Sequence, residues 1–150
     1  MKTLRFIGMA IVAIITSVNF AACSDDDDDI DVAELLGLWE PIHAEGYWTE
    51  DDGTRTPFDR DINAASNDED YTRIEFLGEG IYKAYYYYNG WQTEDAEDNL
   101  TYQISGNKIQ IKNNTDNEVE ESVIVSLTSN QLIVEWRDGE DYEKITYKRI

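Results

Sequence analysis

From residue 36 to residue 150, apolar and polar side chains alternate along the chain in short runs. The runs recur about every ten residues and are separated by turn-forming pairs such as Asn89-Gly90 and Asp138-Gly139. A period of two places every second side chain on the same face of a strand. The pattern therefore predicts antiparallel strands at about 38–48, 71–77, 81–88, 100–104, 109–111, 119–127, 132–136 and 142–149.

The pattern gives eight sequential strands, and eight strands are enough for a sheet to close on itself as a barrel. The predicted fold class is all-β, an eight-stranded antiparallel up-and-down barrel. Pro41 marks a bulge or an edge position in the first strand, and Val123, Val125 and Leu127 share one face of the strand at 119–127. The polar, acidic segment 49–70 is predicted as a long loop, and 31–36 as one short helical turn.

The first 22 residues have the pattern of a signal peptide. Lys2 and Arg5 precede an apolar run at 6–15, and small and neutral residues follow. A spanning helix is the alternative, but the run is shorter than the roughly 20 apolar residues that a bilayer requires. We therefore assign 1–22 to a signal peptide.

The next residues, Ala21-Ala22-Cys23, resemble the lipobox of bacterial lipoproteins, with Phe20 where that family usually has Leu. The resemblance implies that Cys23 becomes the lipidated first residue and anchors the protein to a membrane. A free or buried thiol in a secreted protein is the alternative. Cys23 is the only cysteine of the chain, which excludes an intramolecular disulfide.

Residues 23–34 then form the lipidated cysteine and an acidic tether. Ser24 and the five carboxylates at 25–29 cannot pack and stay hydrated. Cys-Ser-Asp-Asp-Asp resembles the export signal of surface lipoproteins of certain Gram-negative anaerobes, which implies an outer-membrane lipoprotein exposed on the cell. A plain spacer, with the protein on the periplasmic face, is the alternative.

The overall charge changes the expected partners. The chain has 12 Lys and Arg against 32 Asp and Glu, a formal net charge of −20. This charge repels nucleic acid, so no nucleic-acid partner is expected. The hydrophobic content of 41% is nonetheless sufficient for a packed core.

Three residues at the ends of the alternating region resemble the lipocalin signature. Gly37-x-Trp39 opens the first strand, and Arg149 lies near the end of the last. In lipocalins the terminal Arg packs over the Trp at the closed end of the barrel. The resemblance implies a lipocalin-like domain over 35–150, in which Gly37, Trp39 and Arg149 close one end.

Catalytic chemistry has little support in the sequence. His43 is the only histidine, and Cys23 is assigned to lipid. A catalytic nucleophile that needs a histidine as its general base would therefore have to use His43. Carboxylates are so abundant that no pair of them is informative. We expect a binding protein that is not an enzyme.

One segment has the spacing of a calcium loop. Its oxygen-bearing side chains are Asp59, Asp61, Asn63, Asn67 and Asp70. Ala64 stands where such loops have a Gly, and no helices flank the segment. An acidic segment produces this spacing easily, so Ca²⁺ is the alternative to a solvated loop, and no other cofactor is expected.

Ligand binding is the function that the predicted fold favours. The aromatic residues expected to point inward, as ligand contacts or as filling of the interior, are Tyr82, Tyr86, Tyr88, Tyr102 and Trp136. They predict a small hydrophobic or planar ligand. The alternative is a non-catalytic adhesion, assembly or glycan-binding module that uses the outward aromatics Trp48, Tyr85, Tyr87 and Trp91 to bind a protein or glycan partner.

Overall fold

The computed structural model describes residues 30–63, 65, 71–87, 89–92 and 100–150. The signal peptide, Cys23 and most of the acidic tether lie outside these residues. The first element of the described residues is a single helical turn, α2 (Val32–Leu35), as predicted. The Asp31 side chain caps it by accepting from the backbone N–H of Ala33 at 2.9 Å. No helix within the described ranges has the length and apolar character needed to cross a bilayer.

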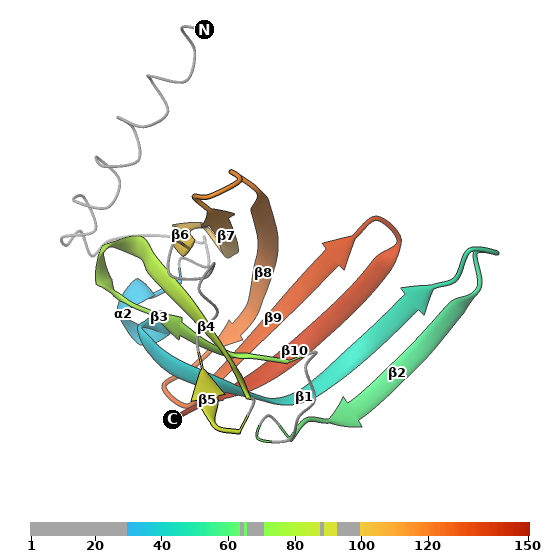
Figure 1. The fold of residues 1–150 in the computed structure, drawn as a ribbon, viewed down its shortest axis with the longest axis horizontal. Coiled ribbons are helices and arrows are strands. Elements are labelled where there is room, and N and C mark those ends of the chain that lie inside the picture. The colour runs from blue at the N-terminus through green and yellow to red at the C-terminus, as the bar shows by residue number, and fades with distance from the viewer. Residues whose placement is uncertain (1–29, 64, 66–70, 88, 93–99) are drawn as a thin grey trace, which may run out of the picture.

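Eight strands form a closed antiparallel barrel, which confirms the predicted fold class (Figure 1). Each of these barrel strands pairs with the barrel strand that follows it in the chain, and the last pairs with the first. The barrel strands are β1 (Gly37–Thr49), β3 (Arg73–Phe76), β4 (Ile81–Tyr87), β6 (Leu100–Ser105), β7 (Lys108–Asn113), β8 (Val119–Leu127), β9 (Gln131–Asp138) and β10 (Asp141–Arg149). A 3₁₀ turn, η1 (Gly78–Gly80), joins β3 to β4.

Two further strands lie beside this barrel. The short β5 (Trp91–Gln92) pairs with the end of β4, and β2 (Arg55–Asp61) pairs with β1 from His43 to Thr49. The prediction of a loop over 49–70 is therefore wrong for 55–61. This strand is mostly exposed, with Phe58 as its one large apolar side chain, so it has no alternation to read. Such a charged sequence with a proline suits a strand at a sheet edge.

Two bulges change which side chains point inward. The register of β1 shifts between Pro41 and His43, which confirms the predicted bulge, and the extra residue reverses the faces of the second half of β1. A second shift in β8, between Ile124 and Ser126, buries Ile124 at 2% exposure and leaves Val125 50% exposed. The expected shared face of Val123, Val125 and Leu127 is therefore wrong, because a strict period of two does not survive a bulge.

The two ends of the barrel differ. Near α2, large apolar side chains fill the interior and make it a closed end. Buried members of this core are Leu35, Trp39, Ile74, Phe76, Tyr82, Ala84, Tyr102, Ile109, Ile124, Leu132 and Tyr147. At the other end, β1, β2, β9 and β10 continue side by side beyond this core (Figure 1). We call this second end the mouth.

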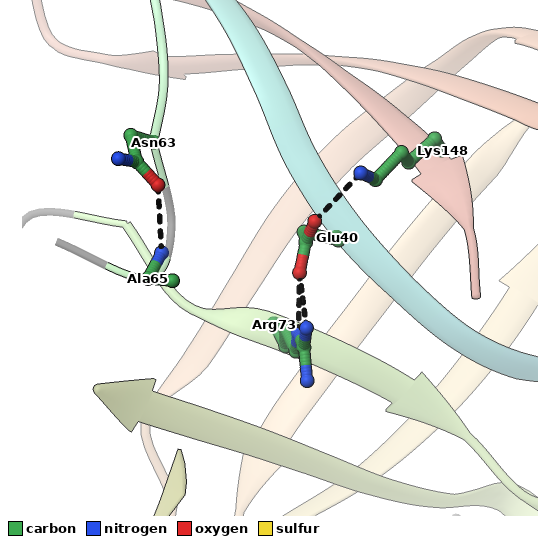
Figure 2. Close-up of polar contacts among 5 residues, drawn as sticks. All are labelled: Glu40, Asn63, Ala65, Arg73 and Lys148. Carbon is green, nitrogen blue, oxygen red and sulfur yellow. Dashed lines mark hydrogen bonds and ion pairs between the residues drawn. The ribbon is translucent and has the colours of Figure 1, made fainter. Parts of the chain in front are cut away.

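A carboxylate on the outer face ties the closing strands together. Glu40 of β1 accepts from Arg73 Nε of β3 at 2.7 Å and forms an ion pair with Lys148 Nζ of β10 at 2.8 Å (Figure 2). Desolvation acts to raise the pKa of Glu40, but the hydrogen bonds and charges of Lys148 and Arg73 outweigh it and lower this pKa. Glu40 therefore remains ionised and links three strands.

Candidate ligand-binding site

A cavity of about 290 Å³ lies inside the barrel, between the closed-end core and the mouth. Its wall is mainly aliphatic and aromatic, with Ser122 and two carboxylates toward the mouth. The lining residues are Trp48, Ile74, Phe76, Tyr82, Ile109, Ile111, Glu120, Ser122, Val134, Trp136, Glu143, Ile145 and Tyr147. A concave apolar site with few polar groups is typical of small-molecule binding, and the volume is near the lower limit for drug-sized ligands.

A second pocket, of about 550 Å³, forms the mouth itself. Trp48, Phe58, Arg60, Tyr71 and Glu143 line it. Trp48 and Glu143 also line the inner cavity, so these two residues stand at the boundary between both spaces. A ligand that enters the cavity from the mouth must pass them.

Small residues on β1 let side chains of β2 reach over the mouth. Gly46 pairs with Phe58, and Ala44 pairs with Arg60. A Cβ at Gly46 would lie 2.9 Å from Phe58 Cζ and 2.1 Å from the carbonyl oxygen of Tyr142. The absence of a side chain at Gly46 therefore allows β1 to approach β10 closely and the Phe58 ring to lie over it.

A buried tyrosine is hydrogen-bonded to the mouth carboxylate. The Tyr71 hydroxyl donates to Glu143 Oε1 at 2.7 Å, and the Arg60 guanidinium lies 5.1 Å from the Tyr71 ring centroid. Burial raises the pKa of Tyr71 to about 12, with Glu143 acting in the same direction and Arg60 against it. The phenol therefore keeps its proton at neutral pH and remains a donor to Glu143.

At the closed end, Arg149 covers the indole of Trp39. The guanidinium lies 4.2 Å from the ring centroid, and its nitrogens donate to backbone carbonyls, including that of Leu36 at 2.6 Å. Trp39 Nε1 donates to the carbonyl of Leu35 at 2.8 Å. Gly37 has a φ of +127°, and a Cβ there would lie 2.7 Å from Arg149 Nη1, so a side chain would obstruct this approach.

The five aromatic residues expected to contact a ligand lie in different places. Tyr82 and Trp136 line the cavity. Tyr102 is buried in the core, where its hydroxyl donates to the carbonyl of Leu77 at 3.1 Å, and it does not line the described cavity. Tyr86 pairs with β5 instead, and its hydroxyl donates to Gln92 at 3.2 Å. Tyr88 lies outside the described residues.

Sequence reasoning missed most of the mouth. Glu143 has the same parity as Ile145, Tyr147 and Arg149, so extending that alternation by one step would have placed a carboxylate inside the barrel. The sequence predicts a loop where Phe58 and Arg60 form part of β2, so it gives no inward direction for either residue. The bulge near Pro41 concealed the inward direction of Trp48.

The aromatics expected on the outer face also divide. Trp48 is 40% exposed but lines the mouth, where it stacks on Phe58 at 4.8 Å between ring centroids, so its outward assignment is wrong. Trp91 contacts Tyr87 edge-on at 5.4 Å, and the Arg73 guanidinium lies 3.7 Å from its centroid. One face of the Trp91 ring is therefore already covered.

Two of the expected metal ligands, Asp59 and Asp61, are exposed residues of β2. Asp59 and Asp61 belong to extended β2 instead of a calcium-type loop, Asn63 accepts from the N–H of Ala65 (Figure 2), and Asp70 lies outside the described residues. Oδ1 of Asp59 and of Asp61 lies 3.4 Å and 3.1 Å from the ring nitrogens of His43.

His43, Glu45 and Asp59 each offer one ligand atom within 4.8 Å of the others. Lys144 already forms an ion pair with Glu45. His43 is not among the residues that line the described cavity or the mouth, so a base there would not face a ligand in the barrel.

The lipocalin-like domain family matches residues 35–134 of the chain, from α2 into β9. The chain belongs to the lipocalin-like domain family. No protein among the curated proteins matches it. For this lipocalin-like barrel, the family and the interior cavity together indicate the binding of a small hydrophobic ligand.

Proposed function

We propose that this protein is a lipid-anchored surface lipoprotein whose barrel binds one small, largely apolar ligand without catalysing a reaction. The observation that supports the ligand is the cavity of about 290 Å³, walled by aliphatic and aromatic side chains and continuous with an aromatic mouth. An apolar molecule gains free energy in proportion to the surface it removes from water there. Tyr82 and Trp136 add rings that favour a planar or cyclic body.

The first test is native mass spectrometry of the protein purified gently from its own host. A bound mass that is lost on denaturation is the expected result. The matched variants are Val134→Trp, which fills the cavity, and Val125→Trp, which adds the same ring to an exposed position of β8. Only Val134→Trp should remove the bound mass. Loss with both variants or with neither would contradict binding in the cavity.

The anchor rests on the sequence alone. Cys23 in its lipobox context and the acidic tether support an outer-membrane protein facing outward, with the periplasmic face as the alternative. Cys23→Ala should move the protein from the membrane fraction to the soluble fraction. Protease added to intact cells should degrade the wild-type protein, and its protection there would indicate the periplasmic face.

A further inference from the structure

Four residues form a row around the inner face of the mouth, which we call the mouth row. Trp136 of β9 pairs with Glu143 of β10, Glu143 pairs with Gly46 of β1, and Gly46 pairs with Phe58 of β2. Because directly paired residues point to the same face of a sheet, these positions lie next to one another. Glu143 is therefore the carboxylate in a row that has an aromatic residue on each side.

The gap at Gly46 brings the second ring close to Glu143. A Cβ on Gly46 would lie 2.9 Å from Phe58 Cζ and 3.0 Å from the Cα of Glu143, so the ring and the Glu143 backbone approach the same empty position. Trp48 stacks on Phe58 with an interplanar angle of 18°. Two stacked rings therefore line the mouth together with Glu143.

The charges that face this space are mostly negative. Glu143 and Glu120 line the cavity, and Arg60 is the one basic side chain among the described residues that lines either the cavity or the mouth. Two carboxylates against one guanidinium favour a positively charged ligand group. The net charge of −20 on the whole chain also attracts cations from solution.

An ammonium group is the ligand head that suits both features. Aromatic faces attract cations through the ring quadrupole, and a carboxylate adds direct charge attraction. A fatty-acid head would instead bring a second negative charge beside Glu143. The aliphatic wall below, with Ile109, Val134 and Ile145, suits the apolar part of the same molecule.

We propose that the ligand is an organic cation, with a protonated amine or quaternary ammonium head at the mouth row and an apolar body in the cavity. This inference rests on the proposed function, because it requires that the cavity hold a ligand. It adds the charge of that ligand and names Glu143 as the residue that selects it. Arg60, which pairs with Ala44 one step deeper than Phe58, opposes the head.

The test compares three probes that share a phenylbutyl or phenylpropyl body and differ in the head: phenylbutylamine, phenylbutanol and phenylbutyrate. Isothermal titration calorimetry of the full chain at neutral pH should rank the amine first and the carboxylate last. Glu143→Gln should weaken the binding of phenylbutylamine about tenfold and change the affinity for phenylbutanol by less than about twofold. The glutamine amide can still accept from Tyr71, so this substitution retains the shape of the site.

Glu135→Gln is the matched control. Glu135 lies on the neighbouring strand β9 and accepts from the Tyr142 hydroxyl at 2.8 Å, so it repeats the Tyr71–Glu143 pair away from the cavity lining. Glu135→Gln changes the net charge by the same amount as Glu143→Gln, but it should alter the affinity for phenylbutylamine by less than about twofold. Arg60→Gln should have the opposite effect to Glu143→Gln and strengthen the binding of phenylbutylamine.

The outcomes separate the two proposals. If the alcohol binds, Val134→Trp abolishes this binding, and the amine is no tighter than the alcohol, the proposed function stands and the cationic ligand is overturned. Equal weakening of the amine by Glu143→Gln and Glu135→Gln would also overturn it, because only general charge would then matter. If none of the three probes binds the wild-type protein, the cationic ligand is overturned, whereas the proposed function is overturned only if native mass spectrometry also finds no bound mass.

Discussion

The two ends of the barrel use aromatic residues in opposite ways. At the closed end Trp39 is 0% exposed, its indole N–H is bonded to a backbone carbonyl, and Arg149 covers its face. At the mouth Trp48 is 40% exposed and stacks on Phe58 beside a carboxylate. The first arrangement stabilises the fold, whereas the second leaves ring surface available to a ligand.

A glycine leaves space for a different group at each end of the barrel. Gly37 at the closed end adopts a positive φ and leaves room for the guanidinium of Arg149. Gly46 at the mouth has an ordinary φ, and it leaves room for the backbone of β10 and the ring of Phe58. A flexible side chain can move away from a new methyl group more easily than a paired backbone can. The mouth therefore depends on strict backbone spacing even though its side chains are exposed.

The largest contrast should come from truncating one tryptophan at each end. Trp39→Ala should lower the free energy of unfolding by about 3–5 kcal/mol, because it leaves a large cavity in a packed core. Trp48→Ala should cost less than about 1 kcal/mol, because the ring is partly exposed. Urea denaturation followed by circular dichroism measures both losses. Equal losses would mean that the mouth is part of the stabilising core.

A smaller effect is expected from a single methyl group at the mouth. Gly46→Ala should lower the free energy of unfolding by roughly 1–3 kcal/mol, because β1 and β10 must separate around the new Cβ. Gly78→Ala, in the turn before β4, is the control, since a Cβ there meets no atom within 4 Å. It should change the free energy of unfolding by less than about 0.5 kcal/mol. Thermal and urea unfolding of both variants would decide whether the close approach at Gly46 matters.

The smallest effect concerns a carboxylate on each face of the barrel. Glu40 has a lowered pKa in the folded protein, so its stabilising contribution is present above the ordinary value of 4.5 and is lost as the pH falls through the lowered pKa. The free energy of unfolding of the wild type should exceed that of Glu40→Gln by on the order of 1 kcal/mol at neutral pH. The difference should shrink below pH 4.5.

Glu143→Gln serves as the comparison for Glu40→Gln, because we assign Glu143 to ligand binding. Denaturation curves of the two variants across the acid range would test this division. A larger loss of stability at neutral pH with Glu143→Gln than with Glu40→Gln would show that Glu143 is primarily structural.

Much of the barrel could be predicted from alternation alone. The strand at 119–127 was predicted with the bounds that β8 has, and the Gly-x-Trp pattern with Arg149 indicated a lipocalin-like domain. This succeeded because a strand with one buried face needs an apolar residue at every second position. Within β4, Tyr82 and Ala84 follow this rule and are buried.

The mouth could not be predicted in the same way. Residues 55–61 form an edge strand with almost no buried side chains, and a polar strand looks like a loop in the sequence. The bulge in β1 then exchanged the inner and outer faces, so Trp48 was expected outside. Tyr86 has the inward parity of Tyr82, but at that point β4 pairs with β5 and not with β3 or β6.

The sequence by itself determined a series of antiparallel strands, because burial of apolar side chains imposes a local period that can be read directly. The resemblance of Gly37-x-Trp39 and Arg149 to the lipocalin signature indicated the closed end. The tertiary structure alone decided which residues meet at the mouth. Trp136, Glu143, Gly46 and Phe58 come from four strands, and their alignment depends on register. Register is fixed by bulges and by pairing across long sequence separations, and neither is encoded in local alternation.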